Sequence, residues 1–121
     1  MEFAKNNKAI YLQIADGIFE NILSKKWMPE DRIPSVRDFA VNIEVNPNTV
    51  MRAYTYLQEK EIIYNQRGIG FFVSDGAYEK SINIRKTQFV ENELPNVFKN
   101  IDLLGIDITE IERLYNLSRK R

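Results

Sequence analysis

Cysteine and histidine are both absent from the 121 residues of this chain. Without them the chain can form no disulfide bond, no zinc site of the Cys/His type, no thiolate nucleophile and no histidine general base. An enzyme would have to use carboxylates, lysines or tyrosines. The sequence contains neither a carboxylate pair nor a glycine-rich phosphate loop, since Gly68 and Gly70 lie between two expected strands. We therefore predict no catalytic residue, no metal and no cofactor.

Long hydrophobic runs are absent as well. No segment approaches the ~18 consecutive apolar residues of a transmembrane helix, and the N-terminal residues MEFAKNNK lack the apolar run of a signal peptide. The absence of cysteine fits a reducing compartment. We expect a cytoplasmic protein without a membrane partner.

The net charge is zero, with 17 basic and 17 acidic residues. Residues 1–76 carry nine basic and ten acidic side chains, and residues 77–121 carry eight and seven. Phosphate neutralisation supplies most nonspecific affinity for nucleic acids, so this balance argues against binding through bulk charge. Any DNA binding must depend on where a few cations are placed and on two copies in a dimer.

Hydrophobic residues make up 44% of the chain, enough for one small domain with an appendage. Apolar residues at three- and four-residue spacing predict an amphipathic helix from Ala9 to Lys26. Ile33 is expected in a brief strand. Ser35, followed three residues later by Asp38, resembles a capping box and predicts a helix of about two turns.

A third helix is predicted from the segment VNPNTVMRAY. Asn46 is a favoured N-cap, and Pro47 at the first helical position has no N–H to leave unpaired. This helix should run to about Lys60. Two short strands, Ile62–Gln66 and Phe71–Ser74, are then joined by a turn at residues 67–70.

The pattern changes after Gly76. Helical spacing begins at Phe89, Pro95 is expected to bend or interrupt that helix, Gly105 should end it, and Asp107 should cap a final helix. Two such helices cannot bury two apolar faces alone in ~45 residues. We expect residues 77–121 to form a helical dimerisation tail. Its contact residues would be Val90, Leu94, Val97, Phe98, Ile101, Leu104, Ile111 and Leu114.

The two helices after Ser35 form a helix-turn-helix pattern, in which the second helix lies in the DNA major groove. At about 100° per residue, Asn48, Thr49, Arg52 and Thr55 lie on one side of the second helix, opposite its apolar stripe. Such side chains can bond to base edges and phosphates. The alternative is an ordinary solvated face with a good cap.

The hairpin that follows favours the DNA-binding interpretation. A three-helix core with a two-stranded ribbon is a winged helix, and Arg67-Gly68-Ile69-Gly70 would be the wing tip. Glycines there permit close backbone approach, and an arginine suits a minor groove or a phosphate. Arg67 could alternatively be an ordinary exposed hairpin charge. The predicted fold class is mostly α with a small β-hairpin (α+β), with the winged helix-turn-helix domain at residues 1–76.

Three segments together resemble the winged-helix domain of GntR-type bacterial transcription regulators. They are IYLQIADGIFENIL, IPSVRDFA and VNPNTVMRAYTYLQEKEIIYNQRGIGFFVS, and they cover about residues 9–74. The Pro-Ser-x-Arg, Asn-Pro-Asn-Thr-Val and Arg-Gly-x-Gly-x-Phe-Val blocks have the family's order and spacing. The Asn-Pro-Asn-Thr form and the short tail are similar to the YtrA branch, which has a small dimerisation appendage.

The resemblance implies a homodimer that binds a palindromic operator in double-stranded DNA and represses a nearby operon, often one encoding a transporter. An effector ligand is not implied. The DNA-binding residues that it implies are Ser35, Arg37, Asn46, Asn48, Thr49, Arg52, Arg67, Gly68 and Gly70. For Arg37, a surface salt bridge is the alternative.

Four positions depart from the family pattern. Glu44 stands where glycine is frequent, Met51 where arginine is frequent, Ile69 where a basic residue is frequent, and Phe71 where a small or hydroxyl residue is frequent. The neutral net charge and the apolar wing residues Ile69, Phe71 and Phe72 leave a second hypothesis open. In it, the winged helix is a protein-interaction module that does not bind DNA.

Overall fold

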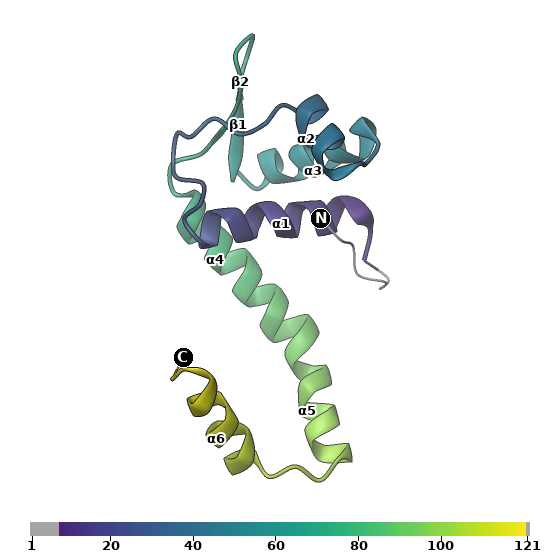
Figure 1. Ribbon diagram of the computed structural model, residues 1–121, viewed down its shortest axis with the longest axis vertical. Coiled ribbons are helices and arrows are strands. Elements are labelled where there is room, and N and C mark those ends of the chain that lie inside the picture. The colour runs from purple at the N-terminus through teal and green to yellow at the C-terminus, as the bar shows by residue number, and fades with distance from the viewer. Residues whose placement is uncertain (1–7, 121) are drawn as a thin grey trace. The chain divides into compact units, whose positions relative to one another are not determined.

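The computed structural model describes residues 8–120 and divides into two compact units, Met1–Ile84 and Arg85–Arg121 (Figure 1). Each unit is described by itself. Within the described residues, no helix is both long enough and apolar enough to cross a bilayer. The predicted fold class, mostly α with a small β-hairpin, is confirmed.

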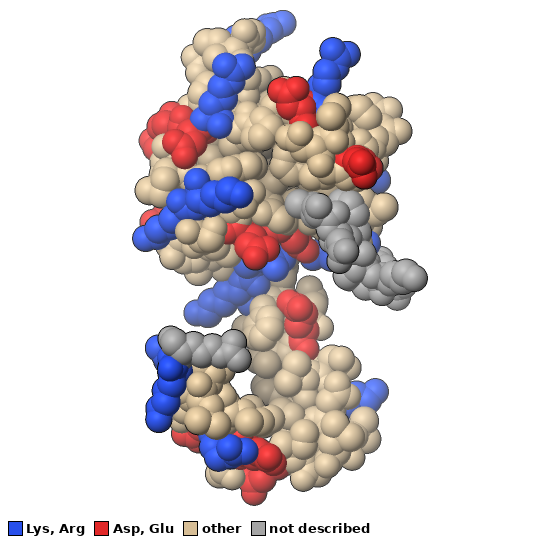
Figure 2. Space-filling view, viewed as in Figure 1, with Lys and Arg blue, Asp and Glu red and all other residues tan. Residues whose placement is uncertain are grey.

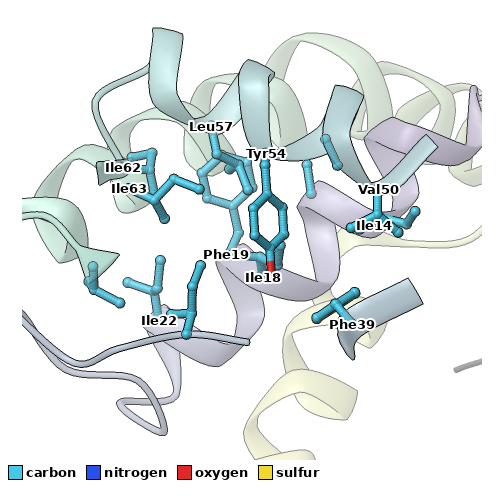
Figure 3. Packing of buried hydrophobic residues seen from close by; sticks show 14 of the residues in the cluster. Ile14, Ile18, Phe19, Ile22, Phe39, Val50, Tyr54, Leu57, Ile62 and Ile63 are labelled. Atoms are coloured by element: carbon cyan, nitrogen blue, oxygen red, sulfur yellow. The ribbon is translucent and has the colours of Figure 1, made fainter. Parts of the chain in front are cut away.

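Two amphipathic helices form most of the core of the first unit. Helix α1 (Ile10–Leu23) and helix α3 (Pro47–Glu59) each turn one apolar stripe inward, because their apolar residues recur every three or four positions. These stripes pack together as Figure 3 shows. The buried residues are Ile14, Ala15, Ile18, Phe19 and Ile22 from α1, and Val50, Ala53, Tyr54 and Leu57 from α3.

The short helix α2 (Val36–Ile43) begins and ends as its local sequence requires. The Ser35 Oγ accepts a hydrogen bond of 3.1 Å from the Asp38 N–H, which satisfies one of the free donors of the first turn. At the other end, Glu44 adopts a left-handed conformation with φ +56°. Glycine is the residue that adopts this conformation most easily, which explains why glycine is common there in the family pattern.

The wing is an antiparallel pair of strands, β1 (Ile63–Gln66) and β2 (Gly70–Val73), in which Ile63 faces Val73 and Gln66 faces Gly70. It projects beyond the helices of the first unit (Figure 1). The segment before α2 adds to the outer edge of β2 through hydrogen bonds from Ile33 N–H to Phe71 O and from Val73 N–H to Asp31 O, both 3.0 Å. The brief strand expected at Ile33 is thus a single bridge at the neighbouring Arg32.

Tyr54 joins α3 to the rest of the first unit. Its side chain is fully buried, its ring meets the rings of Phe39 and Phe71 edge-on at 6.1 and 4.9 Å, and its hydroxyl donates a 2.6 Å hydrogen bond to the Pro34 carbonyl. Figure 3 shows the ring standing between α3 and α1. Because Pro34 directly precedes the cap of α2, this bond fixes α3 against the start of α2.

Helix α4 (Ala77–Gln88) was not expected from the sequence. Its segment AYEKSINIRKTQ lacks a clear apolar stripe, and only Ala77 and Ser81 are buried. The packing of Ala77, with Tyr78 and Ile84 against the same core, supplies a tertiary reason for this helix.

The second unit contains a five-residue π-helix η1 (Phe89–Glu93), helix α5 (Leu94–Leu103) and helix α6 (Ile108–Ser118). The interruption expected at Pro95 takes the form of η1, with the proline in the first turn of α5. Asp107 caps α6 as expected, accepting a 2.9 Å hydrogen bond from the Thr109 N–H. None of the described residues from 85 to 120 is buried.

Candidate nucleic-acid interface

The outer face of α3 carries the polar residues that the sequence analysis singled out. Asn48, Arg52 and Thr55 are exposed and Thr49 is half-buried, while the apolar stripe faces the core. Met51, on the same helix, is 41% exposed and adds an apolar side chain to its surface. The helix therefore presents amide, hydroxyl and guanidinium groups of the kinds that bond to base edges.

The Asn46 side chain caps the helix at the start of this face. Its Oδ1 accepts a 2.8 Å hydrogen bond from the Asn48 N–H, which caps α3. That oxygen is occupied, so the Asn46 side chain offers mainly its amide NH₂ to an outside partner. Its neighbour Asn48 contributes only its backbone N–H to the cap.

Arg52 is held against α1. Its guanidinium lies 4.1 Å from the centroid of the Tyr11 ring, and the Tyr11 ring in turn meets the Tyr56 ring edge-on at 6.3 Å. Such cation–π contacts are worth about 0.5–1 kcal/mol at exposed sites. Arg52, Asn48 and Thr49 line a shallow hollow of 460 Å³ together with Tyr11. The stack thus fixes a cation beside the two polar residues that begin α3.

Ser35 and Arg37 lie at the start of α2. The Ser35 oxygen accepts the cap bond from Asp38, whereas the exposed Arg37 has no carboxylate within ion-pair distance anywhere in residues 8–120. The salt bridge considered as an alternative for Arg37 is therefore absent from the described part of the chain. Its guanidinium is available to a ligand from solution.

The wing tip has the backbone that its glycines were expected to provide. Gly68 has φ +79° and Gly70 has φ +152°, both in a region that favours glycine, and the Ile69 N–H donates a 2.9 Å bond to the Gln66 carbonyl. Arg67 is exposed beside Gly68. The structure thus brings Arg67 and Gly68 to an exposed turn.

Gly70 has a further neighbour that the sequence analysis missed. A Cβ atom at this position would lie 3.0 Å from the Nε of Arg32, and the Arg32 Nη2 donates a 2.6 Å hydrogen bond to the Ile69 carbonyl. The only local sign of this arrangement is the extended segment between Pro29 and Pro34, in which Arg32 is exposed and Ile33 is buried. Its contact with the wing follows from the fold.

The aromatic residues of β2 pack against other aromatic residues of the same chain. Phe71 is half-buried against Tyr54, and the Phe72 ring stacks on Tyr64 with centroids 5.6 Å apart. The Tyr64 hydroxyl donates a 2.6 Å bond to Glu30, and this bond raises the pKa of Tyr64 above its ordinary value. Of the three apolar wing residues, only Ile69 remains as an exposed side chain, at 49%.

The arginines of the first unit lie on particular segments of the fold. Arg32, Arg37, Arg52 and Arg67 are all exposed and lie before α2, on α2, on α3 and at the wing tip, respectively. Figure 2 shows basic side chains projecting at the wing end of this unit, with acidic groups beside and below them on the same face. The arginines of the first unit are therefore placed on or beside the helix-turn-helix and the wing, although the net charge of the chain is zero.

The tail residues predicted to make dimer contacts are accessible in the second unit. Val90, Val97, Phe98, Leu104 and Leu114 are between 43% and 71% exposed, and the other three are half-buried. Further large apolar side chains of this unit share that exposure, namely Phe89, Leu103, Ile108, Tyr115 and Leu117. An apolar surface of this extent is typical of a protein–protein contact.

Comparison with known proteins gives one consistent result. Residues 10–73 match the family described as bacterial regulatory proteins, gntR family. The HTH-type transcriptional regulator YhcF of Bacillus subtilis (strain 168) is 35% identical over 107 residues, which cover 88% of this chain and 87% of YhcF. The HTH-type transcriptional repressor YtrA of the same organism is 34% identical over 115 residues, covering 92% of this chain and 82% of YtrA.

A solved structure is similar over nearly the whole chain. It is a GntR-family transcriptional regulator from Bacteroides thetaiotaomicron, with 50% sequence identity and a TM-score of 0.74. The match covers 93% of this chain and 100% of that one, so it includes the helical tail as well as the winged helix.

Proposed function

This chain belongs to the gntR family of bacterial regulatory proteins, and from that premise we propose that it is a homodimeric transcription repressor that binds a palindromic DNA operator. The family and the relatives named above are transcription regulators and not enzymes. Repression is proposed because YtrA is named a repressor. By the same resemblance, the proposed target is a nearby operon that encodes a transporter.

The observation that carries the proposal is the composition of the outer face of α3. An N-capped helix presents Asn48, Thr49 and Arg52 to solvent while Tyr54 anchors its other side in the core. In a helix-turn-helix protein this is the helix that enters the major groove, with its N-terminal residues against base edges. Asn48 is the residue best suited to a base, because an exposed amide can bond bidentately to adenine.

The cations around this helix have separate proposed roles. Arg37 in the first turn of α2 would bond to a phosphate, and Arg67 with Gly68 at the wing tip would meet the backbone or the minor groove. Ser35 and Asn46 support the interface by capping α2 and α3. Gly70 permits the close packing of the wing.

Dimerisation is assigned to residues 77–121, following the winged-helix domain of residues 1–76. The exposed apolar residues of η1, α5 and α6 would pack against the same segment of a second chain, in a two-fold contact. Two copies of α3 would then meet successive major grooves, ~34 Å apart. A palindromic operator follows from the two-fold symmetry.

The protein-interaction hypothesis has less support. It rested on the neutral net charge and on the apolar wing residues Ile69, Phe71 and Phe72. The two phenylalanines pack on Tyr54 and Tyr64 within the chain. Ile69 alone is a small surface for a partner protein. The concentration of arginines on the wing and helix-turn-helix favours a polyanion.

The proposal is tested by selecting duplexes from a random DNA pool with the full chain. We expect an enriched palindrome whose half-sites are about 10 base pairs apart. Asn48→Ala should weaken binding to the selected duplex by about 10- to 100-fold with an unchanged salt dependence. Arg37→Ala should also reduce the slope of log K against log salt by about 2 per dimer, because each lost phosphate contact contributes about 0.9.

Lys26→Ala is the control, since Lys26 is an exposed cation outside the proposed interface. Its affinity should equal that of the wild type within a factor of about two. Enrichment of no sequence, or unchanged affinity in both the Asn48 and the Arg37 variants, would contradict the assigned interface.

A further inference from the structure

Arg32 connects the segment before α2 with the tip of the wing. Its Nη2 donates a 2.6 Å hydrogen bond to the carbonyl of Ile69, 37 residues away in the sequence. At the same time, its Nε, Nη2 and Cζ atoms would lie 3.0, 3.3 and 3.4 Å from a Cβ atom at Gly70. The guanidinium thus lies close against the backbone of Gly70, in space that any other residue would fill.

The wing has little else to hold its tip. A two-stranded ribbon with four residues per strand is marginally stable by itself. Backbone bonds between residues 30–33 and β2 are made only at Phe71 and Val73. Among the hydrogen bonds of the described residues, the bond from Arg32 is the one that reaches residues 67–70 from outside the hairpin.

We propose that Arg32 is a positioning residue for the wing, holding the turn that carries Arg67 in the conformation that meets DNA. The inference rests on the proposed function, because it assigns Arg32 to the same DNA interface. Arg32 acts through the Ile69 carbonyl and the Gly70 backbone and makes no required contact with DNA. The fork of the guanidinium is essential, since a lysine ammonium cannot lie flat against Gly70 and donate to Ile69 together.

A competing explanation is that Arg32 is one more cation for a phosphate, because its side chain is exposed. Only the positive charge of the side chain would then contribute to DNA affinity, and Arg32→Lys would retain that affinity. The two explanations also differ in how Arg32 and Arg67 combine. If Arg32 positions the wing, the contribution of Arg67 to DNA affinity depends on the presence of Arg32. If the two residues make independent phosphate contacts, their contributions to the free energy of binding add.

The first experiment needs no DNA. Backbone ¹⁵N relaxation of the Gly68 and Ile69 amides is compared in the wild-type chain, Arg32→Lys, Arg32→Ala and the control Lys26→Ala. We expect order parameters of about 0.85 in the wild type and the control, and values below about 0.6 in both Arg32 variants. Far-ultraviolet circular dichroism and the melting temperature confirm that each variant is folded. Unchanged order parameters in Arg32→Ala would overturn the proposal.

The second experiment is a double-mutant cycle on the selected duplex. Arg67→Ala should weaken binding several-fold in the wild-type background and have almost no effect in the Arg32→Ala background. Arg32→Lys should lose about as much affinity as Arg32→Ala. Additive losses, or wild-type affinity in Arg32→Lys, would overturn the positioning role. If no duplex is enriched, the proposed function fails, and the order parameters of Gly68 alone decide whether Arg32 holds the wing.

Discussion

Glu44 shows how one residue sets the geometry of the helix-turn-helix. It ends α2 with φ +56°, and its backbone N–H bonds to the carbonyls of Ala40 and Val41. The left-handed conformation turns the chain so that Val45 and Asn46 lead into α3. A side chain with a Cβ atom adopts this conformation at a cost of about 1–2 kcal/mol.

We therefore expect Glu44→Gly to raise the free energy of unfolding by about 1 kcal/mol, since the strain relieved exceeds the extra backbone entropy of glycine. Denaturant unfolding monitored by circular dichroism measures the change. Asn42→Gly, two residues earlier and inside α2, should instead lower stability by a few tenths of a kcal/mol. A loss of stability in Glu44→Gly would contradict this account of the turn.

Tyr54 is a second residue on which the local geometry depends. We expect Tyr54→Phe to lower the free energy of unfolding by about 1–2 kcal/mol, because the Pro34 carbonyl loses its 2.6 Å donor in a half-buried position. Tyr56→Phe is a matched control on α3, since the Tyr56 hydroxyl makes no hydrogen bond within residues 8–120. Equal stability of the Tyr54 and Tyr56 variants would show that the bond to Pro34 contributes nothing.

The same residue predicts a pH dependence. Burial raises the pKa of the Tyr54 hydroxyl above its ordinary value. A group whose pKa is raised on folding stabilises fully below its unfolded pKa, here about 10, and that stability is lost as the pH rises through the folded pKa. The stability of the wild type should therefore fall above about pH 10 relative to that of Tyr54→Phe, as measured by unfolding in urea.

At the scale of the element, helix α6 shows that a helix cap can depend only on residues close together in the sequence. The Asp107 carboxylate accepts bonds from the Thr109 N–H at 2.9 Å and from the Thr109 hydroxyl at 2.8 Å. The backbone bond, followed by the hydroxyl bond, lowers the pKa of Asp107 below its ordinary value. The stabilisation is therefore complete above about pH 4 and is lost as the pH falls through the depressed pKa.

Asp107→Ala should fray the first turn of α6 at neutral pH, which the ¹³Cα chemical shifts of residues 108–111 report. Asp107→Asn retains an acceptor that does not titrate, so its shifts should change less below pH 4 than those of the wild type, which should move toward coil values. Helical shifts in Asp107→Ala equal to those of the wild type at pH 7 would contradict the cap.

At the scale of the whole molecule, the prediction concerns the dimer contact proposed for the tail. Phe98 and Leu114 are exposed apolar residues of α5 and α6. Changing either to Glu would bury two unpaired carboxylates in a dimer contact, and we expect the dimer dissociation constant to rise by about 100-fold. Sedimentation velocity measures this change, and operator affinity should fall with it.

Asn100→Glu on α5 is the matched control, because it adds the same charge at an exposed polar position. It should sediment as the wild type does. If Phe98→Glu and Leu114→Glu also remain dimeric, the tail does not form the dimer contact.

The sequence predicted α1, α2, α3 and the wing because their signals are local. The apolar spacing of α1 and α3, the caps Ser35, Asn46 and Asp107, and the glycines of the wing each act within one or two turns of chain. Helix α4 was missed because its twelve residues carry no apolar stripe. Its residues Ala77 and Ser81 are buried only when the rest of the first unit is folded.

The sequence by itself therefore determined the elements other than α4, their caps and the polar face of α3, since propensity and periodicity depend on neighbours along the chain. Only the tertiary structure decided what each functional side chain touches. It placed Arg52 on Tyr11, Tyr54 on Pro34 and Arg32 against Gly70. These contacts join residues that are distant in sequence. Their geometry depends on how helices and strands pack, which no local pattern records.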